Sequence, residues 1–133
     1  MLVTIEKVLL LKQIPQFKTV SNLALSDLMA VSVELTVKKG EELIRAGEPN
    51  KYMYFLLSGS LTEEGDKVKT TIEAKAVVGL NSVFLITAAK KRVVTKEKCT
   101  LLRVEREQLY RMMALHPSLA TTILNELSSM IHS

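Results

Sequence analysis

Residues 31–105 are a series of short apolar segments separated by turn residues, and this pattern restricts the possible folds more than any other feature. In the first segment Val31, Val33, Leu35 and Val37 alternate with polar residues, which is the period of a half-buried strand. Turn signals recur roughly every eight to twelve residues. The later segments expected to be strands are 43–44, 52–57, 61–62, 68–72, 92–97 and 100–105. We therefore expect a small β-roll or barrel, with the last two of these strands paired to each other.

Helical patterns flank this strand-rich region on both sides. Before it, residues 5–12 follow helical spacing, and Ser21 or Ser26 can cap a second short helix. After it, residues 105–115 and a final helix opened by Ser118 carry apolar stripes. The sequence predicts one domain over residues 1–133, made of an N-terminal helical motif, a β-roll and C-terminal helices over residues 1–30, 31–105 and 106–133.

The composition indicates a folded domain of ordinary type. The chain has 133 residues, 47% of them hydrophobic, which is enough to bury a core without disulfides. Its apolar runs are too short to cross a bilayer, and its start lacks a secretory signal pattern. Cys99 is the only cysteine, so no internal disulfide can form. We expect a cytoplasmic protein with no direct membrane insertion.

The formal charge of +4 raises the question of nucleic-acid binding. The basic residues cluster at 38–39, 90–92 and 96–98, and acidic residues are interleaved with them. A DNA-reading helix usually presents Arg and Lys along one face, and neither C-terminal helix does so. A solvated surface with a mild positive excess explains the charge better, and we expect no nucleic-acid partner.

No residues are arranged for catalysis or metal binding. His116 precedes a proline at a helix break, His132 is near the C-terminus, and neither has a Cys or carboxylate at ligand spacing. Cys99 is expected to pack as a small apolar residue. Met112 and Met113 are expected to belong to the helix core. The sequence therefore predicts no catalytic residue, no metal site and no enzymatic activity.

Two stretches carry a family resemblance. Residues 38–49 (KKGEELIRAGEP), followed by residues 54–59 (YFLLSG), contain a strand, a Gly turn, a strand, a Gly-Glu-Pro turn, an aromatic strand and a Gly. This order resembles the cyclic nucleotide-binding domain, the domain of catabolite activators and of protein kinase A regulatory subunits. Residues 5–17 look like its N-terminal helical motif, and residues 99–105 like its last strand. The resemblance covers nearly the whole chain and implies a jelly-roll-like β-roll, a cupin-like double-stranded β-helix.

The resemblance also locates a phosphate-binding cassette between Val78 and Thr95. In family members that bind cyclic AMP or cyclic GMP, a Gly-Glu pair holds the ribose hydroxyl, and an Arg nine residues after the Glu holds the cyclic phosphate. Here Gly79 is kept, the Glu position is Leu80 and the Arg position is Ala89. Counting back from Cys99 gives Ala89 again. The cassette is therefore degenerate, because both charged groups are missing.

The missing groups have a calculable effect on affinity. A hydrogen bond that involves a charged group contributes about 1.5–3 kcal/mol. The loss of two such bonds costs about 3–6 kcal/mol, roughly two to four decades of affinity. The remaining phosphate contacts would be backbone N–H groups near Asn81 and Ser82, which form a weaker anion site. Tight binding of cyclic AMP or cyclic GMP is not expected.

A cationic run beside the vacant Arg position offers a replacement. In an extended segment Lys91 would point the same way as Ala89, and a small shift in alignment would bring in Arg92 instead. The alternative is that residues 90–92 form a solvated surface corner. The candidate ligand-binding residues are Gly79, Leu80, Asn81, Ser82, Ala89, Lys90, Lys91, Arg92 and Val93.

Two functions follow. The first is a non-catalytic regulatory or interaction domain with weak, altered or absent ligand response and no certain cofactor. In the family the last helix acts as a lid, which here implies a lid face of Leu127, Met130 and Ile131. The second is a sensor of a cyclic nucleotide, or another phosphorylated ligand, bound through residues 90–92. Expected partners are a small anionic ligand, a protein partner or fused output domain, and a second copy paired through the terminal helices.

Overall fold

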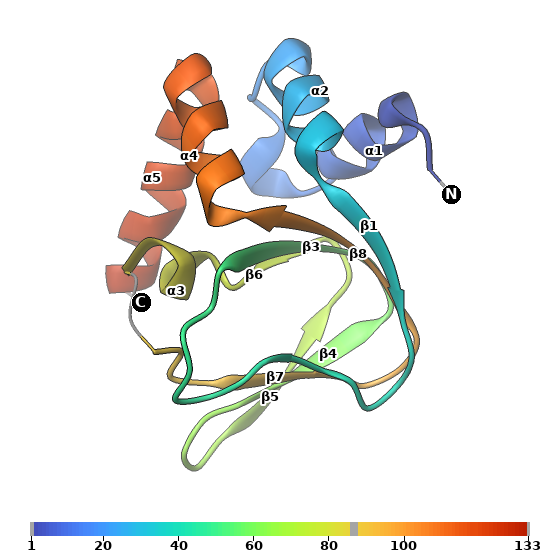
Figure 1. Cartoon of the computed structure of the whole chain (residues 1–133), viewed down its shortest axis with the longest axis vertical. Coiled ribbons are helices and arrows are strands. Elements are labelled where there is room, and N and C mark those ends of the chain that lie inside the picture. The colour runs from blue at the N-terminus through green and yellow to red at the C-terminus, as the bar shows by residue number, and fades with distance from the viewer. Residues whose placement is uncertain (1, 86–87, 133) are drawn as a thin grey trace.

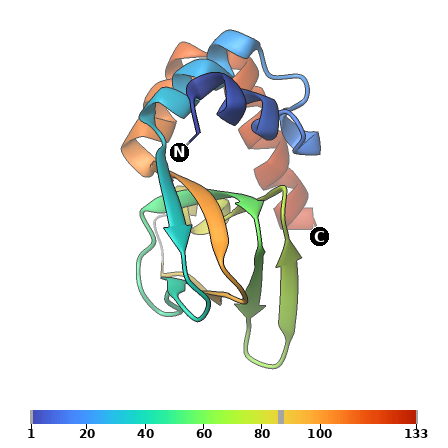
Figure 2. The same ribbon diagram turned by 90° about the vertical axis from the view of Figure 1, so that its right-hand side faces the viewer.

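The computed structural model describes residues 2–85 and 88–132, and for Leu85 and residues 130–132 it describes the backbone alone. The helices are α1 (Thr4–Leu11), η1 (Pro15–Phe17), α2 (Asn22–Val31), α3 (Leu80–Leu85), α4 (Arg106–Leu115) and α5 (Pro117–His132). The strands are β1 (Val33–Val37), β2 (Glu42–Ile44), β3 (Tyr52–Ser58), β4 (Ser60–Glu64), β5 (Lys69–Glu73), β6 (Ala76–Val78), β7 (Arg92–Thr95) and β8 (Cys99–Glu105). The described strands form two antiparallel sheets, ordered β1-β8-β3-β6 and β2-β7-β4-β5. Helices α1, α2, α4 and α5 gather on one side of this β-roll (Figure 1, Figure 2).

The sheet β1-β8-β3-β6 is covered on both faces, which gives the domain two cores. Along β8, Leu102 and Val104 pack with the helices, whereas Cys99 and Leu101 pack inside the roll. This split follows from the alternation of side chains along a strand. In the helix-side core the ring of Phe17 meets that of Phe55 edge-on, with centroids 5.3 Å apart. The N-terminal helices therefore share one core with the roll.

The fold class expected from the sequence is confirmed: a β-roll with N-terminal helices and two C-terminal helices. The start of the first strand was placed too early, because Val31 is the last residue of α2 and β1 begins at Val33. Ser21 caps α2, since its hydroxyl oxygen accepts a hydrogen bond from the backbone N–H of Ala24 at 3.1 Å. Alternation alone misled here, because Val31 continues the apolar pattern of β1 in the sequence although it is the last residue of α2.

The expected pairing of the last two strands is wrong. Strand β7 pairs with β2 and β4, whereas β8 pairs with β1 and β3, so the turn between them connects the two sheets. The end of β7 is held by the β1–β2 turn. The buried hydroxyl of Thr95 donates to the carbonyl oxygen of Lys38 at 2.6 Å and accepts from the N–H of Glu41 at 2.8 Å. Strand β6, which the sequence did not predict, completes the edge of the first sheet.

Candidate functional site

A cavity of about 350 Å³ lies where the turn after β6, helix α3 and β7 approach one another. All of the predicted pocket residues except Arg92 line this cavity. The additional lining residues come from the neighbouring strands and from the segment before β7: Ile44, Glu63, Ile72, Val77, Val78 and Ala88. The residues that the sequence singled out, Arg92 aside, therefore lie together around one cavity.

Gly79 is required at its position by both conformation and space. Its φ is +84°, in the left-handed region that L-residues with a side chain rarely adopt. A Cβ atom there would lie 2.8 Å from the carbonyl oxygen of Tyr52 and 2.9 Å from Nδ2 of Asn50. The turn that opens the cavity can therefore form in this shape only with glycine.

Asn50 holds this turn against the rest of the roll. Its side chain is buried, and Nδ2 donates to the carbonyl oxygen of Tyr52 at 2.7 Å and to Oγ of Ser82 at 3.0 Å. The Ser82 hydroxyl in turn donates to the carbonyl oxygen of Gly79 at 3.2 Å. The Ser82 side chain is thus occupied by bonds within the protein. Asn50 was not singled out from the sequence, and the Pro-Asn step that precedes an aromatic strand is its only signal.

Leu80 and Ala89, which the resemblance places at the two charged positions of the cassette, are both buried. Leu80 is 1% exposed and packs in the helix-side core, and Ala89 is 6% exposed and packs in the roll interior. The backbone of Ala89 is also engaged. Its N–H donates to the carbonyl oxygen of Glu48 at 2.9 Å, and its carbonyl oxygen accepts from the N–H of Gly47 at 2.8 Å. Neither residue brings a charge to the cavity, and the backbone N–H of Ala89 is already used within the protein.

The cations of the 90–92 run separate into two groups. Lys90 and Lys91 are exposed residues of the cavity lining. Nζ of Lys91 lies 3.3 Å from Oε1 of Glu63, a carboxylate that also lines the cavity. Arg92 was predicted to be a pocket residue, but the structure places it outside the cavity lining. Val93, the next residue of β7, is buried in the lining, and alternation along the strand turns Arg92 to the opposite face.

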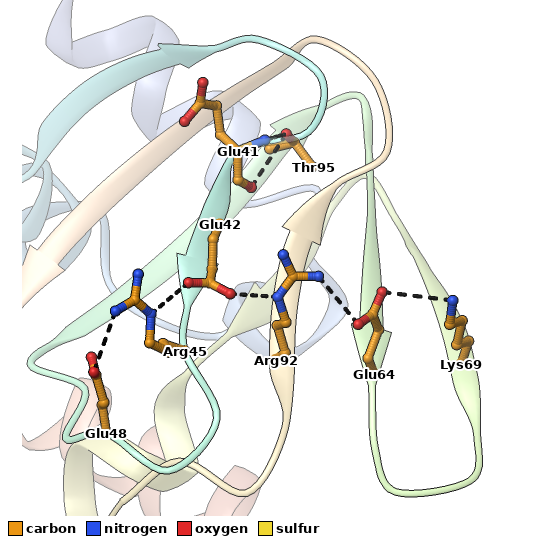
Figure 3. Close-up of polar contacts among 8 residues, drawn as sticks. All are labelled: Glu41, Glu42, Arg45, Glu48, Glu64, Lys69, Arg92 and Thr95. Atoms are coloured by element: carbon orange, nitrogen blue, oxygen red, sulfur yellow. Dashed lines mark hydrogen bonds and ion pairs between the residues drawn. The ribbon is translucent and has the colours of Figure 1, made fainter.

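Arg92 belongs to a chain of alternating charges on the outer face of the second sheet (Figure 3). Its guanidinium contacts the carboxylate of Glu42 through Nε, and its Nη1 lies 3.2 Å from Oε2 of Glu64. The chain continues in both directions, with Nε of Arg45 2.8 Å from Oε1 of Glu42 and Nζ of Lys69 3.9 Å from Oε1 of Glu64. Residues from β2, β7, β4 and β5 contribute in the order of those strands in the sheet.

These ion pairs shift the ionisation of their members. The hydrogen bond from Arg45, followed by that from Arg92, holds the pKa of the Glu42 carboxyl below its ordinary value. The carboxylates of Glu42 and Glu64 raise the pKa of Arg92. The guanidinium of Arg92 is therefore both positioned and neutralised by neighbours on the outer face.

Helix α3 is tied to the C-terminal helices. Nε of Arg106, the first residue of α4, donates to the carbonyl oxygen of Val83 at 2.7 Å, and its Nη2 donates to that of Asn50 at 2.9 Å. The rings of Phe84 and Tyr110 meet edge-on with centroids 5.3 Å apart. The sequence did not identify Arg106. In the predicted lid, Leu127 packs against the helix-side core, while the side chains of Met130 and Ile131 lie outside the described residues.

The residues considered for catalysis, Cys99 and His116, are engaged in contacts within the fold. Burial raises the pKa of the Cys99 thiol, which lies in the roll interior and packs as a small apolar residue. His116 has a carboxylate partner that its sequence neighbours did not suggest: its Nε2 lies 2.8 Å from Oδ2 of Asp27 on α2. In residues 2–85 and 88–132 there is no group of three His, Cys, Asp or Glu residues that could hold a metal ion. Across the same residues, no helix combines the length and hydrophobicity needed to cross a membrane.

Comparisons with known proteins agree with this architecture. The model of the family described as cyclic nucleotide-binding domain matches residues 34–116. The structure is similar to the sensor domain of the transcriptional regulator DNR from Pseudomonas aeruginosa (TM-score 0.80, 21% identity, 97% of this chain and 91% of that chain). It is also similar to the Toxoplasma gondii PKA regulatory domain solved with cAMP (TM-score 0.82, 14% identity, 95% of this chain and 50% of that chain). A third similar structure is the Thermus thermophilus catabolite activator protein (TM-score 0.78, 14% identity, 89% of this chain and 58% of that chain). The chain thus spans 50% and 58% of the length of the latter two chains. No curated protein sequence matches the chain.

Proposed function

The chain belongs to the cyclic nucleotide-binding domain family, and from this membership we propose that it is a non-catalytic regulatory or sensor domain in which tight binding of cyclic AMP or cyclic GMP is weakened or lost. The observation that carries the proposal is that Leu80 and Ala89, both buried and uncharged, stand at the two charge-bearing positions of the cassette. The nearby guanidinium of Arg92 supports it as well, because Glu42 and Glu64 hold this group on the outer face. The cytoplasmic location stays a prediction from the sequence.

The contacts of α3 support a regulatory role. Arg106 and the Phe84–Tyr110 pair link the wall of the cavity to α4, and α5 packs against the same region. A change in the cavity can therefore alter the position of the C-terminal helices, which carry the predicted lid. We infer that the output is read by a protein partner, a fused domain or a second copy bound through the terminal helices. Light scattering at several concentrations tests the dimer, which a constant monomer mass would exclude.

Isothermal titration calorimetry tests the proposal directly. We expect no binding, or dissociation constants in the millimolar range, for cyclic AMP, cyclic GMP and cyclic dinucleotides, because Leu80 and Ala89 supply neither a carboxylate for the ribose hydroxyl nor a guanidinium for the phosphate. A catabolite activator that binds cyclic AMP serves as the positive control in the same buffer. Micromolar binding of any of these nucleotides would overturn the proposal.

A second candidate function rests on the position of Lys90 and Lys91 in the cavity lining. In this alternative the domain senses a cyclic nucleotide or another phosphorylated ligand, whose phosphate is held by these ammonium groups. Micromolar binding that disappears in the Lys91→Ala, Arg92→Ala double variant would favour it. The matched control is Lys96→Ala with Arg111→Ala, because both residues are exposed and lie outside the cavity lining.

A further inference from the structure

The cavity is apolar in its depth and charged only at its rim. The lining residues that are buried are all apolar, with exposed fractions of at most 6%: Ile44, Val78, Leu80, Ala89 and Val93. The charged lining residues, Glu63, Lys90 and Lys91, are half-buried or exposed. A group that enters the depth of this cavity meets hydrocarbon, whereas a group at the mouth meets charges.

The rim has an excess of one positive charge, since two lysines face one glutamate. Glu63 is 3.3 Å from Lys91 and neutralises much of its charge. Lys90 has no ion-pair partner among the residues that the structure describes, and the neighbouring residues 85–87 carry no carboxylate. A single anionic head group at the mouth would therefore face Lys90 and could share Lys91 with Glu63.

We propose that this cavity binds a small amphipathic monoanion, a carboxylate with an unbranched apolar body of about six to ten carbons, whose head group lies beside Lys90 and Lys91. The inference rests on the proposed loss of nucleotide binding and names the ligand class that the same cavity accepts. The buried side chains of Val78, Leu80 and Val93 offer no hydrogen-bond partner to ribose hydroxyls or a phosphate. An alkyl chain removes apolar surface from water at those same positions. The volume of about 350 Å³ is at the lower end of that of small-molecule pockets, about 300–1,000 Å³.

A homologous series of carboxylates gives the sharpest test, with hexanoate, octanoate and decanoate titrated into the whole chain by calorimetry. Each buried methylene should increase the affinity about fourfold. Hexanol, octanol and decanol should show the same increments but weaker binding, because they lack the charge that faces Lys90. Affinity that does not depend on chain length would show binding to surface lysines only and would overturn the proposal.

Two pairs of variants separate the depth from the rim. Val93→Thr places a hydroxyl in the apolar depth and should weaken octanoate binding at least about fivefold. Its control is Val94→Thr, the same exchange at the next residue of β7, whose side chain alternates to the other face and should leave binding unchanged. Lys90→Gln should weaken octanoate binding about two- to fivefold, as expected for an exposed ion pair. Lys98→Gln, an exposed lysine outside the cavity lining, is its control.

The outcomes distinguish this inference from the function on which it rests. If neither carboxylates nor cyclic nucleotides bind, the monoanion proposal fails while the loss of nucleotide binding stands. If cyclic AMP binds in the micromolar range, the proposed function fails. If Val93→Thr and Val94→Thr weaken octanoate equally, with the same thermal unfolding midpoint as the parent chain, the cavity is not the binding site and the monoanion proposal is overturned.

Discussion

The two faces of strand β7 have opposite chemistry. On the outer face Arg92 lies in a chain of alternating charges that runs across all strands of its sheet (Figure 3). On the inner face Val93 is 2% exposed and lines a cavity whose buried lining is apolar. The sheet thus has many charges, yet none of the outer ones is available to a ligand inside.

This difference shows that closeness in sequence to a binding position does not make a charge part of the site. Arg92 is three residues from Ala89, but it is the first residue of β7, where it faces away from the cavity that its neighbour Val93 lines. Two carboxylates on neighbouring strands then hold its guanidinium. Bringing Arg92 into the cavity would require breaking both ion pairs and turning the strand over, which would also expose Val93.

The largest expected effect comes from placing charges in the apolar cavity. The double variant Leu80→Glu, Ala89→Arg restores the charged pair that the family uses for the ribose and the phosphate. If their absence limits binding, the affinity for cyclic AMP should rise by roughly two to four decades, the equivalent of about 3–6 kcal/mol. Calorimetry with cyclic AMP measures this gain, and circular dichroism confirms that the variant is folded.

The matched control makes the same two exchanges on the surface. Leu124→Glu with Ala114→Arg changes two exposed residues of α5 and α4, and it should leave cyclic AMP binding as weak as in the parent chain. A folded cavity variant that gains no affinity would show that the shape of the cavity, rather than its missing charges, prevents nucleotide binding. Equal gains in both variants would indicate a general electrostatic effect.

A smaller effect is expected at the turn that opens the cavity. Gly79→Ala should lower the free energy of unfolding by about 2–3 kcal/mol, because the left-handed backbone disfavours a Cβ atom and the carbonyl oxygen of Tyr52 would lie only 2.8 Å from it. Gly47→Ala is the control: its φ is +85°, but nothing lies within 4 Å of the added atom. It should cost about 1 kcal/mol. Urea unfolding measures both, and equal losses would show that the close contact near Gly79 contributes nothing.

The sequence predicted the roll and the lining of the cavity better than it predicted the pairing of the strands. Ala89 and Lys91 both line the cavity, as expected for an extended segment, but so does Lys90, because residues 90–91 form a bend before β7 and do not alternate like a strand. Within β7 alternation does report which face a residue takes, with Val93 inside and Arg92 outside the lining. It does not report which strands pair, because β7 and β8 are close in sequence but belong to different sheets.

The long-range contacts of single polar side chains could not be predicted from the sequence either. Asn50 and Arg106 bind backbone carbonyl groups of residues far along the chain, and no local pattern encodes such partners. The partners of Arg92 were missed for the same reason. Glu42 and Glu64 become its neighbours only when β2, β7 and β4 align, and they hold the guanidinium on the outer face.

The smallest expected effect is the acid dependence of the outer charge chain. Arg45 and Arg92 lower the pKa of Glu42 in the folded protein below the value of 4.5 that an unperturbed Glu has. The stabilisation is therefore fully present above pH 4.5 and is lost as the pH falls through the lowered pKa. Thermal unfolding between about pH 6 and pH 3 should show a smaller acid-induced loss of stability for Glu42→Gln than for the parent chain, and high salt should reduce the difference.

The control is Glu107→Gln, because Glu107 is an exposed residue of α4 outside the charge chain, and this variant should behave like the parent. If Glu42→Gln and the parent lose stability in parallel, the charge chain does not stabilise the outer face, and the orientation of Arg92 follows from the alternation of β7 alone.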